Sequence, residues 1–202
     1  MKKIGKRLLL SVVCICLMSG CSNSIADKEI IVNEKPSFET QVFQADGFTI
    51  ELPKGWTRVI KEGEEPSKLV YTFVDENAEV GSQLFTLTKF STSGELASLP
   101  DTLMRYDEKY RGMVKTQFPS NKDFMVGYLT APIGDIIAVN FTIQNTSGDY
   151  DILQETNLYS NTVGDSYQLI AIQKVDKDGK LKGGKLDARE AAYHAVKTIK
   201  KS

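Results

Sequence analysis

Cysteine and histidine are scarce in this chain of 202 residues. The cysteines are Cys14, Cys16 and Cys21, and the single histidine is His194. A structural zinc site needs a cluster of these two residue types, and a Ser-His-Asp triad would need His194 as its base. No Gly-x-Ser-x-Gly elbow is present to supply a nucleophile. We therefore expect no metal site, no cofactor and no catalytic residue, and we predict that the protein is not an enzyme.

Long hydrophobic runs are also missing. The most apolar stretch, residues 8–18, covers about 11 residues, whereas a membrane-spanning helix needs roughly 20. Four basic residues precede this stretch and Ser19-Gly20-Cys21 follows it, which is the three-part plan of a secretory signal. The end of the run resembles the lipobox of bacterial lipoproteins, with Met18 at the position where leucine is most common.

This resemblance implies that residues 1–20 are a signal peptide and that the thiol of Cys21 carries a diacylglycerol. Two acyl chains anchor a protein stably, because each buried methylene adds about 0.8 kcal/mol. The expected location is therefore the extracytoplasmic face of a cell membrane, with membrane lipid as the partner of Cys21. The alternative is an ordinary cleaved signal peptide in which Cys21 has no role.

A basic excess is missing as well. Removal of residues 1–20 leaves 21 basic and 26 acidic residues, a net charge of −5, which argues against general nucleic-acid binding. Residues 174–202 differ, with nine basic against four acidic residues. One hypothesis places their lysines, among them Lys197, Lys200 and Lys201, on anionic lipid or cell-wall polymer. The alternative is a solvated loop and a well-terminated helix.

Two segments follow the signal peptide. Residues 21–41 are polar and show no lasting apolar period, so we predict the lipidated cysteine and a flexible tether. Residues 42–202 form a single globular domain. Within it, alternation and turn residues predict strands at 48–52, 56–60, 69–74, 83–90, 123–130, 136–144, 150–160 and 166–175. A helix is predicted from Leu99 to Pro119 and another from Asp187 to about Lys200. This order predicts an α+β fold, an antiparallel β-sheet flanked by helices.

One stretch of nine residues, Phe48-Thr49-Ile50-Glu51-Leu52-Pro53-Lys54-Gly55-Trp56, resembles the opening hairpin of PsbP-like domains. These domains begin with an aromatic-led strand that ends in Pro-x-Gly-Trp. The resemblance extends to the element order over about residues 42–200 and implies a PsbP-like α/β/α sandwich. It also implies a non-catalytic binding or stabilising role. No functional residue carries over, because Pro53, Gly55 and Trp56 are expected to be structural.

Three further patterns have competing interpretations. His194 lies outside the apolar stripe of the last helix, so we expect it to be exposed. Asp176 and Asp178 are similar to part of a calcium loop, but Lys180 and Lys182 interrupt that pattern and favour a plain turn. Acid–base hydrolysis would need two carboxylates that meet in space. The candidates Glu51, Asp107 and Glu155 belong to no recognisable motif.

Two functional hypotheses remain. The first is an accessory module that binds or stabilises an envelope protein. The second is a carrier or sensor of a small ligand, in a pocket between sheet and helix lined by residues such as Tyr106, Tyr110 and Tyr128, which are otherwise core residues. A large cavity would favour the carrier, and a flat exposed apolar patch would favour the protein partner.

Overall fold

The computed structural model describes residues 28–60, 63, 65–78, 83–117, 121, 124–144, 152–176, 178, 180–182 and 186–202. Two helices, α1 (Leu99–Gln117) and α2 (Ala188–Thr198), and ten strands form within these residues. The strands are β1 (Thr40–Ala45), β2 (Phe48–Pro53), β3 (Trp56–Val59), β4 (Val70–Asp75), β5 (Gln83–Thr92), β6 (Met125–Ala131), β7 (Gly134–Gln144), β8 (Ile152–Ser160), β9 (Gly164–Val175) and β10 (Lys200–Lys201).

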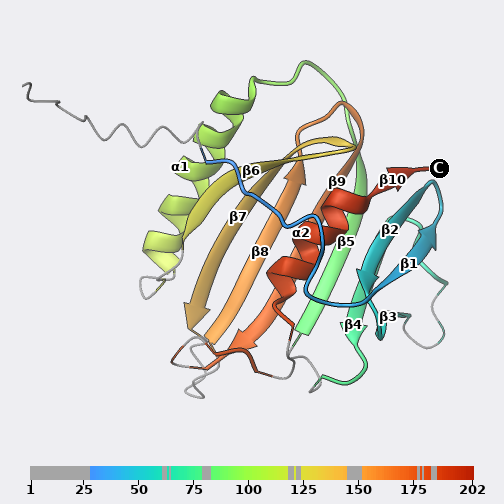
Figure 1. Cartoon of the computed structure of the whole chain (residues 1–202). Helices are drawn as coiled ribbons and strands as arrows, with labels where there is room; N and C mark the ends of the chain where they lie inside the picture. Colours follow the sequence, from blue (N-terminus) through green and yellow to red (C-terminus); the bar gives the residue numbers. More distant parts are fainter. Residues whose placement is uncertain are drawn as a thin grey trace, which may run out of the picture.

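The strands form two antiparallel sheets. The larger has seven strands in the order β3-β4-β5-β9-β8-β7-β6, and the smaller has β2 between β1 and β10. The helix α2 and the smaller sheet lie on one face of the larger sheet, while α1 lies on the other face at the β6 side (Figure 1). These layers confirm the predicted α+β fold with helices flanking an antiparallel sheet.

Side-chain alternation along the strands produces this layering, because successive residues of a strand point to opposite faces. On β7, Ile136 and Ala138 join the core beneath α2, whereas Ile137 and Val139 join the core beneath α1. Most predicted strands are confirmed within one or two residues at each end. The strands β1 and β10 were not predicted.

The helix α2 begins as expected and ends early. The Asp187 carboxylate caps its first turn by accepting a hydrogen bond from the Arg189 backbone N–H at 2.8 Å. The predicted end at about Lys200 is wrong by two residues, since Ile199 is extended and the next two residues pair with β2 as β10. The last helical residue, Thr198, accepts a hydrogen bond from the Glu51 N–H of β2 at 3.1 Å. The end of α2 is thereby tied to the smaller sheet.

The predicted tether is wrong over its second part. Residues 21–27 lie outside the described residues, but residues 28–38 form a folded segment, which we call the strap. The strap runs beside β6, where Ile30 N–H donates to the Tyr128 carbonyl at 2.7 Å and Tyr128 N–H donates to the Lys28 carbonyl at 3.0 Å. It then crosses α2, and the domain continues into β1 at Thr40. Three strap side chains pack against the core beneath α2, namely Ile30, Val32 and Phe38.

Candidate functional site

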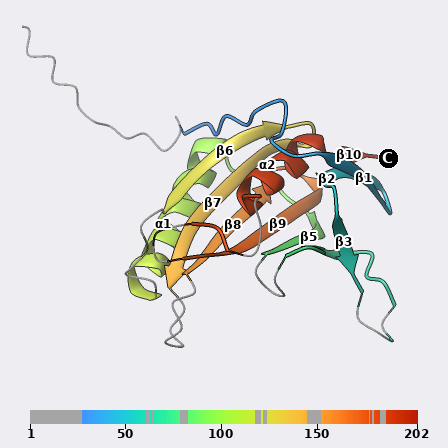
Figure 2. The ribbon, with the colours of Figure 1, turned by 60° about the horizontal axis from the view of Figure 1, so that its bottom comes forward.

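The α1-facing side of the larger sheet is covered over only half of its width. Helix α1 packs on β6 and β7, and none of the described residues forms a helix over β3, β4, β5 and β9 on this side (Figure 2). The strand register lets the exposed half be traced residue by residue. One row runs from Val59 through Thr72 and Thr86 to Ile170, and the next runs from Val70 through Thr88 to Gln168.

We call this surface the open half of the sheet. Its members point away from the core beneath α2, and all are partly or fully exposed: Thr57, Val59, Val70, Thr72, Val74, Thr86, Thr88, Phe90, Gln168, Ile170 and Ile172. None of these eleven residues is charged, and the charged side chains of the same face, Lys174 of β9 and Glu155 of β8, lie at the border of the open half toward β8. The Thr72 and Thr86 hydroxyls lie 3.3 Å apart and satisfy each other, so the surface presents mainly methyl groups.

Exposed apolar side chains cluster on the open half of the sheet and at the strand ends beside it. Val59 is 45% exposed, Val70 is 42% exposed and Phe90 is 40% exposed, and Ile60 and Leu69 follow at the neighbouring strand ends. These are five of the ten large hydrophobic side chains that are exposed among the described residues. Single exposed apolar residues are ordinary on a protein surface, whereas a contiguous group indicates an interaction site.

A hollow of about 380 Å³ continues the open half at its β3 edge. Its lining includes Val59, Val70 and Thr72 of the open half, with Ile60 and Pro66 beside them, and the polar residues Arg58, Glu65 and Ser67 complete it. A hollow of this size accepts one or two side chains of a partner, which is the way that interface hot spots seat an aromatic or aliphatic anchor.

His194 is buried, contrary to the expectation of an exposed histidine. Its side chain is 6% exposed, and its Nε2 lies 3.0 Å from Glu51 Oε2 of β2. The ring of Phe38 packs edge-on against the imidazole, with 5.6 Å between the ring centroids. The helix α2 lies between the sheets and the strap, so it buries more of its circumference than one apolar stripe. His194 and Glu51 therefore join strap, helix and smaller sheet.

A second hollow, of about 240 Å³, lies between the strap and α2. Its apolar lining includes Ile31, Val32 and Pro36, and its polar lining comes from Asn33 of the strap and from α2 and its cap. The polar groups of α2 and its cap are already engaged: Glu190 accepts from the Ser37 N–H and hydroxyl at 2.9 and 2.8 Å, Arg189 pairs with Asp187, Tyr193 bonds Asn140 and His194 bonds Glu51.

The predicted tyrosines lie in the core beneath α1. Tyr106 stacks on Tyr110, and Tyr159 of β8 joins them, with a hydrogen bond between the Tyr110 and Tyr159 hydroxyls. Tyr128 packs against the same core from β6. Burial raises the pKa of Tyr159 and of Tyr106 above the ordinary value of 10.0, and the Tyr110 hydroxyl contributes further at Tyr159. None of these tyrosines lines any of the three hollows described for this chain.

The candidate carboxylates have separate partners. Glu51 bonds His194, Glu155 accepts from Asn157 at 2.9 Å, and Asp107 holds Arg111 with two bonds of 2.8 and 2.9 Å one helical turn away. The described residues contain no group of three or more His, Cys, Asp or Glu that could hold a metal ion.

The acidic loop after β9 is built as a turn. The Asp176 carboxylate accepts hydrogen bonds from the backbone N–H groups of Asp178 and Lys180, both at 2.9 Å. These bonds favour the charged carboxylate and lower the pKa of Asp176, with the bond from Lys180 as the largest cause. The plain turn that Lys180 and Lys182 favoured is therefore the conformation of these residues.

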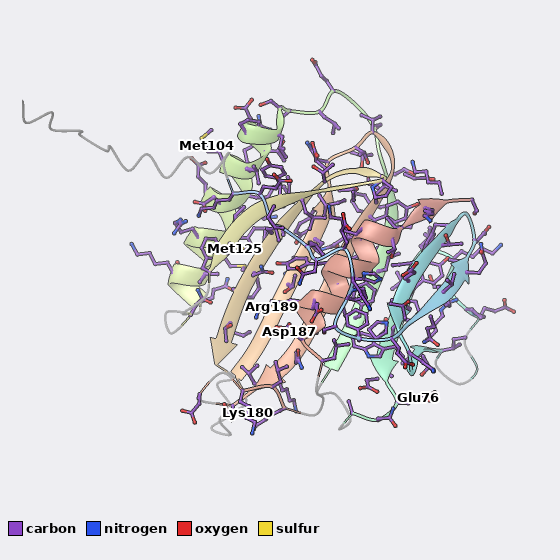
Figure 3. All side chains as sticks on the ribbon, in the orientation of Figure 1. Glu76, Met104, Met125, Lys180, Asp187 and Arg189 are labelled. Carbon is purple, nitrogen blue, oxygen red and sulfur yellow. The ribbon has the colours of Figure 1, made fainter. Side chains whose placement is uncertain are left out.

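The described basic residues near the C-terminus lie at both ends of α2, with Lys197, Lys200 and Lys201 together at its C-terminal end. Lys180 precedes the start of α2, whereas Lys200 and Lys201 follow its end on β10 (Figure 3). The helix thus separates the two groups, and Arg189 pairs with Asp187 at 3.0 Å.

Cys21 lies outside the described residues. Among the residues that the structure does describe, no helix is long and apolar enough to cross a membrane.

Comparisons with known proteins identify no family. No protein-family model matches the chain, and no curated protein matches it. Among solved structures, it is similar to a protein from Bacteroides thetaiotaomicron VPI-5482, at 12% identity and a TM-score of 0.47, over 82% of this chain and 48% of that chain. It is also similar to the cyanobacterial PsbP (CyanoP) of Synechocystis sp. PCC 6803, at 13% identity and a TM-score of 0.49, over 86% and 98% of the two chains.

This chain spans about half the length of the Bacteroides protein. Both TM-scores lie below 0.5, so neither likeness assigns a family or a function. The fold class rests on the layers described above.

Proposed function

We propose that this chain is a membrane-anchored lipoprotein of the extracytoplasmic face, and that its domain binds an envelope protein through the open half of the sheet. The observation that carries the binding proposal is the uncovered face of β3, β4 and β5, where Val59, Val70 and Phe90 are exposed among uncharged side chains. The anchor rests on the sequence around Cys21, where a short apolar run ends in Ser-Gly-Cys.

The chemistry of the open half restricts the partner. Its eleven side chains carry no charge, so a nucleic acid or an acidic polymer would gain no ion pair there. A protein surface with apolar side chains of its own buries methyl groups on both sides, at about 25 cal/mol per Å². We therefore propose a protein partner that inserts an apolar side chain into the adjoining hollow, in a role that is accessory and non-catalytic.

The test is crosslinking in intact cells, followed by detergent extraction and mass spectrometry of the proteins that travel with the chain. The Cys21→Ala form is the control for anchoring. The double variant Val59→Ser and Val70→Ser tests the surface, and Val42→Ser is its matched control, since Val42 is 70% exposed on β1 in the other sheet.

We expect one dominant envelope protein, lost with Cys21→Ala and with the double serine variant but retained with Val42→Ser. Loss of the partner with Val42→Ser, or its retention in the double serine variant, would contradict the proposed surface. A protein without lipid on Cys21, shown by its mass, would contradict the anchor.

The alternative, a carrier or sensor of a small ligand, would use the hollow between strap and α2. Its volume of about 240 Å³ is below the 300–1,000 Å³ that is usual for ligand pockets. Its polar groups on α2 also have partners within the protein. Ligand screening should use a soluble chain that includes residues 28–38, because these residues form one wall. A ligand that protects the chain but not a His194→Ala variant would favour the carrier.

A further inference from the structure

The strap determines how long a free tether can be. The hydrogen bonds between Ile30, Lys28 and Tyr128 hold the chain at the outer edge of β6. Ser37 then binds Glu190 of α2 through both its N–H and its hydroxyl. From Lys28 onward the chain is thus part of the folded domain, and β6 is the last strand of the larger sheet on that side.

Only six residues separate Cys21 from Lys28. A fully extended chain advances at most about 3.6 Å per residue, so seven steps span no more than about 25 Å. A flexible tether that extended to residue 41 would let the domain move much farther from the bilayer. A lipid on Cys21 therefore confines the β6 edge to within about 25 Å of the bilayer surface.

The opposite edge of the larger sheet is β3, six strand spacings away. At about 4.8 Å per spacing, the two edges are about 29 Å apart. Figure 3 labels Met125 of β6 and Glu76, which directly follows β4 beside the β3 edge, on opposite sides of the molecule. The open half of the sheet belongs to the β3 side.

We infer that the strap orients the domain on the membrane, with the β6 edge toward the bilayer and the open half of the sheet turned toward a partner farther from it. This inference rests on the lipid anchor of the proposed function. It adds that the open half is held at a limited distance from the bilayer, because the strap shortens the tether.

Gly127 of β6 provides a way to release the strap. A Cβ at this position would lie 2.8 Å from the Lys28 carbonyl oxygen and 3.2 Å from the Ile30 side chain. The backbone of Gly127 does not have a positive φ, so alanine is tolerated by the strand itself. Gly112 of α1 is the matched control, because a Cβ there meets nothing within 4 Å. Gly127→Ala should therefore displace the strap, and Gly112→Ala should leave it in place.

The experiment uses the full-length, processed protein, purified from membranes and reconstituted in phosphatidylcholine–phosphatidylglycerol vesicles that contain an acceptor lipid. Apart from Cys21, the cysteines lie within residues 1–20, so a fluorophore can be attached at Thr130→Cys of β6 or at Glu76→Cys, directly after β4. Both positions are exposed. Energy transfer to the bilayer then reports which edge lies closer.

Because five strand spacings, about 24 Å of sheet, separate β6 from β4, we expect transfer at Thr130 to exceed transfer at Glu76 by about twofold or more. Gly127→Ala should remove most of this difference, and Gly112→Ala should preserve it. Equal transfer at the two positions, or a difference that Gly127→Ala leaves unchanged, would overturn the inference.

Two controls distinguish failure of the inference from failure of the proposed anchor. The mass of Cys21 shows whether the lipid is present, and its absence would overturn the anchor and the orientation together. Hydrogen exchange on an unlipidated Cys21→Ala chain tests the strap alone. We expect slow exchange at the Ile30 and Tyr128 amides and fast exchange in the Gly127→Ala variant. Fast exchange in both would overturn the strap.

Discussion

The two halves of the α1-facing side differ although they belong to one sheet with one register. Beneath α1, Val126, Ile137 and Val139 are at most 1% exposed. On the other half, Val59 and Val70 are more than 40% exposed, and they project from the same face. The strands themselves are alike in both halves, so the difference comes from the presence or absence of α1.

This difference distinguishes the apolar residues that stabilise the fold from those that are available to bind a partner. A sheet face buries its apolar residues only where another layer covers it. The covered half therefore contributes to the folding free energy, whereas the open half contributes little to it. Apolar side chains that do little for the fold yet occur together are the ones we assign to a partner.

The largest expected effect comes from a matched pair of phenylalanines on this face. Phe141 of β7 lies in the core beneath α1 and is 3% exposed, whereas Phe90 of β5 is 40% exposed on the open half. Phe141→Ala should lower the free energy of unfolding by about 3–5 kcal/mol, because it leaves a cavity. Phe90→Ala should cost about 1 kcal/mol or less. Urea denaturation of both variants measures the difference. Equal losses of unfolding free energy would contradict the division of this face into a covered half and an open half.

An effect of intermediate size on the free energy of unfolding is expected at alkaline pH, and it comes from tyrosines of the covered half. Burial raises the pKa of Tyr106 and Tyr159 above 10.0 in the folded protein. Above about pH 10 the unfolded chain loses these protons while the folded protein keeps them, so stability is complete below pH 10 and falls as the pH rises further. Each such group can contribute up to about 1.4 kcal/mol per pH unit.

The Tyr159→Phe variant tests this cause. It should show a shallower loss of stability between pH 9 and pH 11 in urea denaturation than the unsubstituted protein. A slope unchanged by Tyr159→Phe would show that Tyr159 ionises as readily in the folded protein as in the unfolded chain.

The smallest expected effect concerns the open half alone. Val59→Ser and Val70→Ser should each change the free energy of unfolding by about 0.5 kcal/mol or less, since both side chains are already largely in water. Val139→Ser, on the same face beneath α1, should cost several times more, because it places a hydroxyl in an apolar core. Thermal unfolding of the three variants gives the comparison, and a large cost at Val59 or Val70 would show that an unrecognised layer covers the open half.

The fold was largely predictable because its signals are local. Phe48, Ile50 and Leu52 alternate with polar residues, and α1 and α2 carry apolar stripes at helical spacing. The strand β1 was missed because Val42, its most apolar outward residue, interrupts the expected pattern with an exposed valine. The strand β10 has two lysines and no apolar signal at all.

The strap and His194 were mispredicted because their partners lie far away in the sequence. Ile30 bonds Tyr128, nearly a hundred residues later, and His194 bonds Glu51 across 143 positions. No local pattern encodes such contacts. The open half was predictable in part, since Thr72 and Thr86 gave the polar side of two strands. That α1 covers β6 and β7 and leaves β4 and β5 bare depends on three-dimensional packing.

The most direct test of the binding surface is site-specific photo-crosslinking in intact cells. A photoreactive amino acid is placed at Val70 on the open half or at Val42 on β1, two exposed valines in different sheets. The account predicts that Val70 crosslinks one envelope protein and that Val42 does not. Crosslinking of the same protein from Val42 but not from Val70 would contradict it.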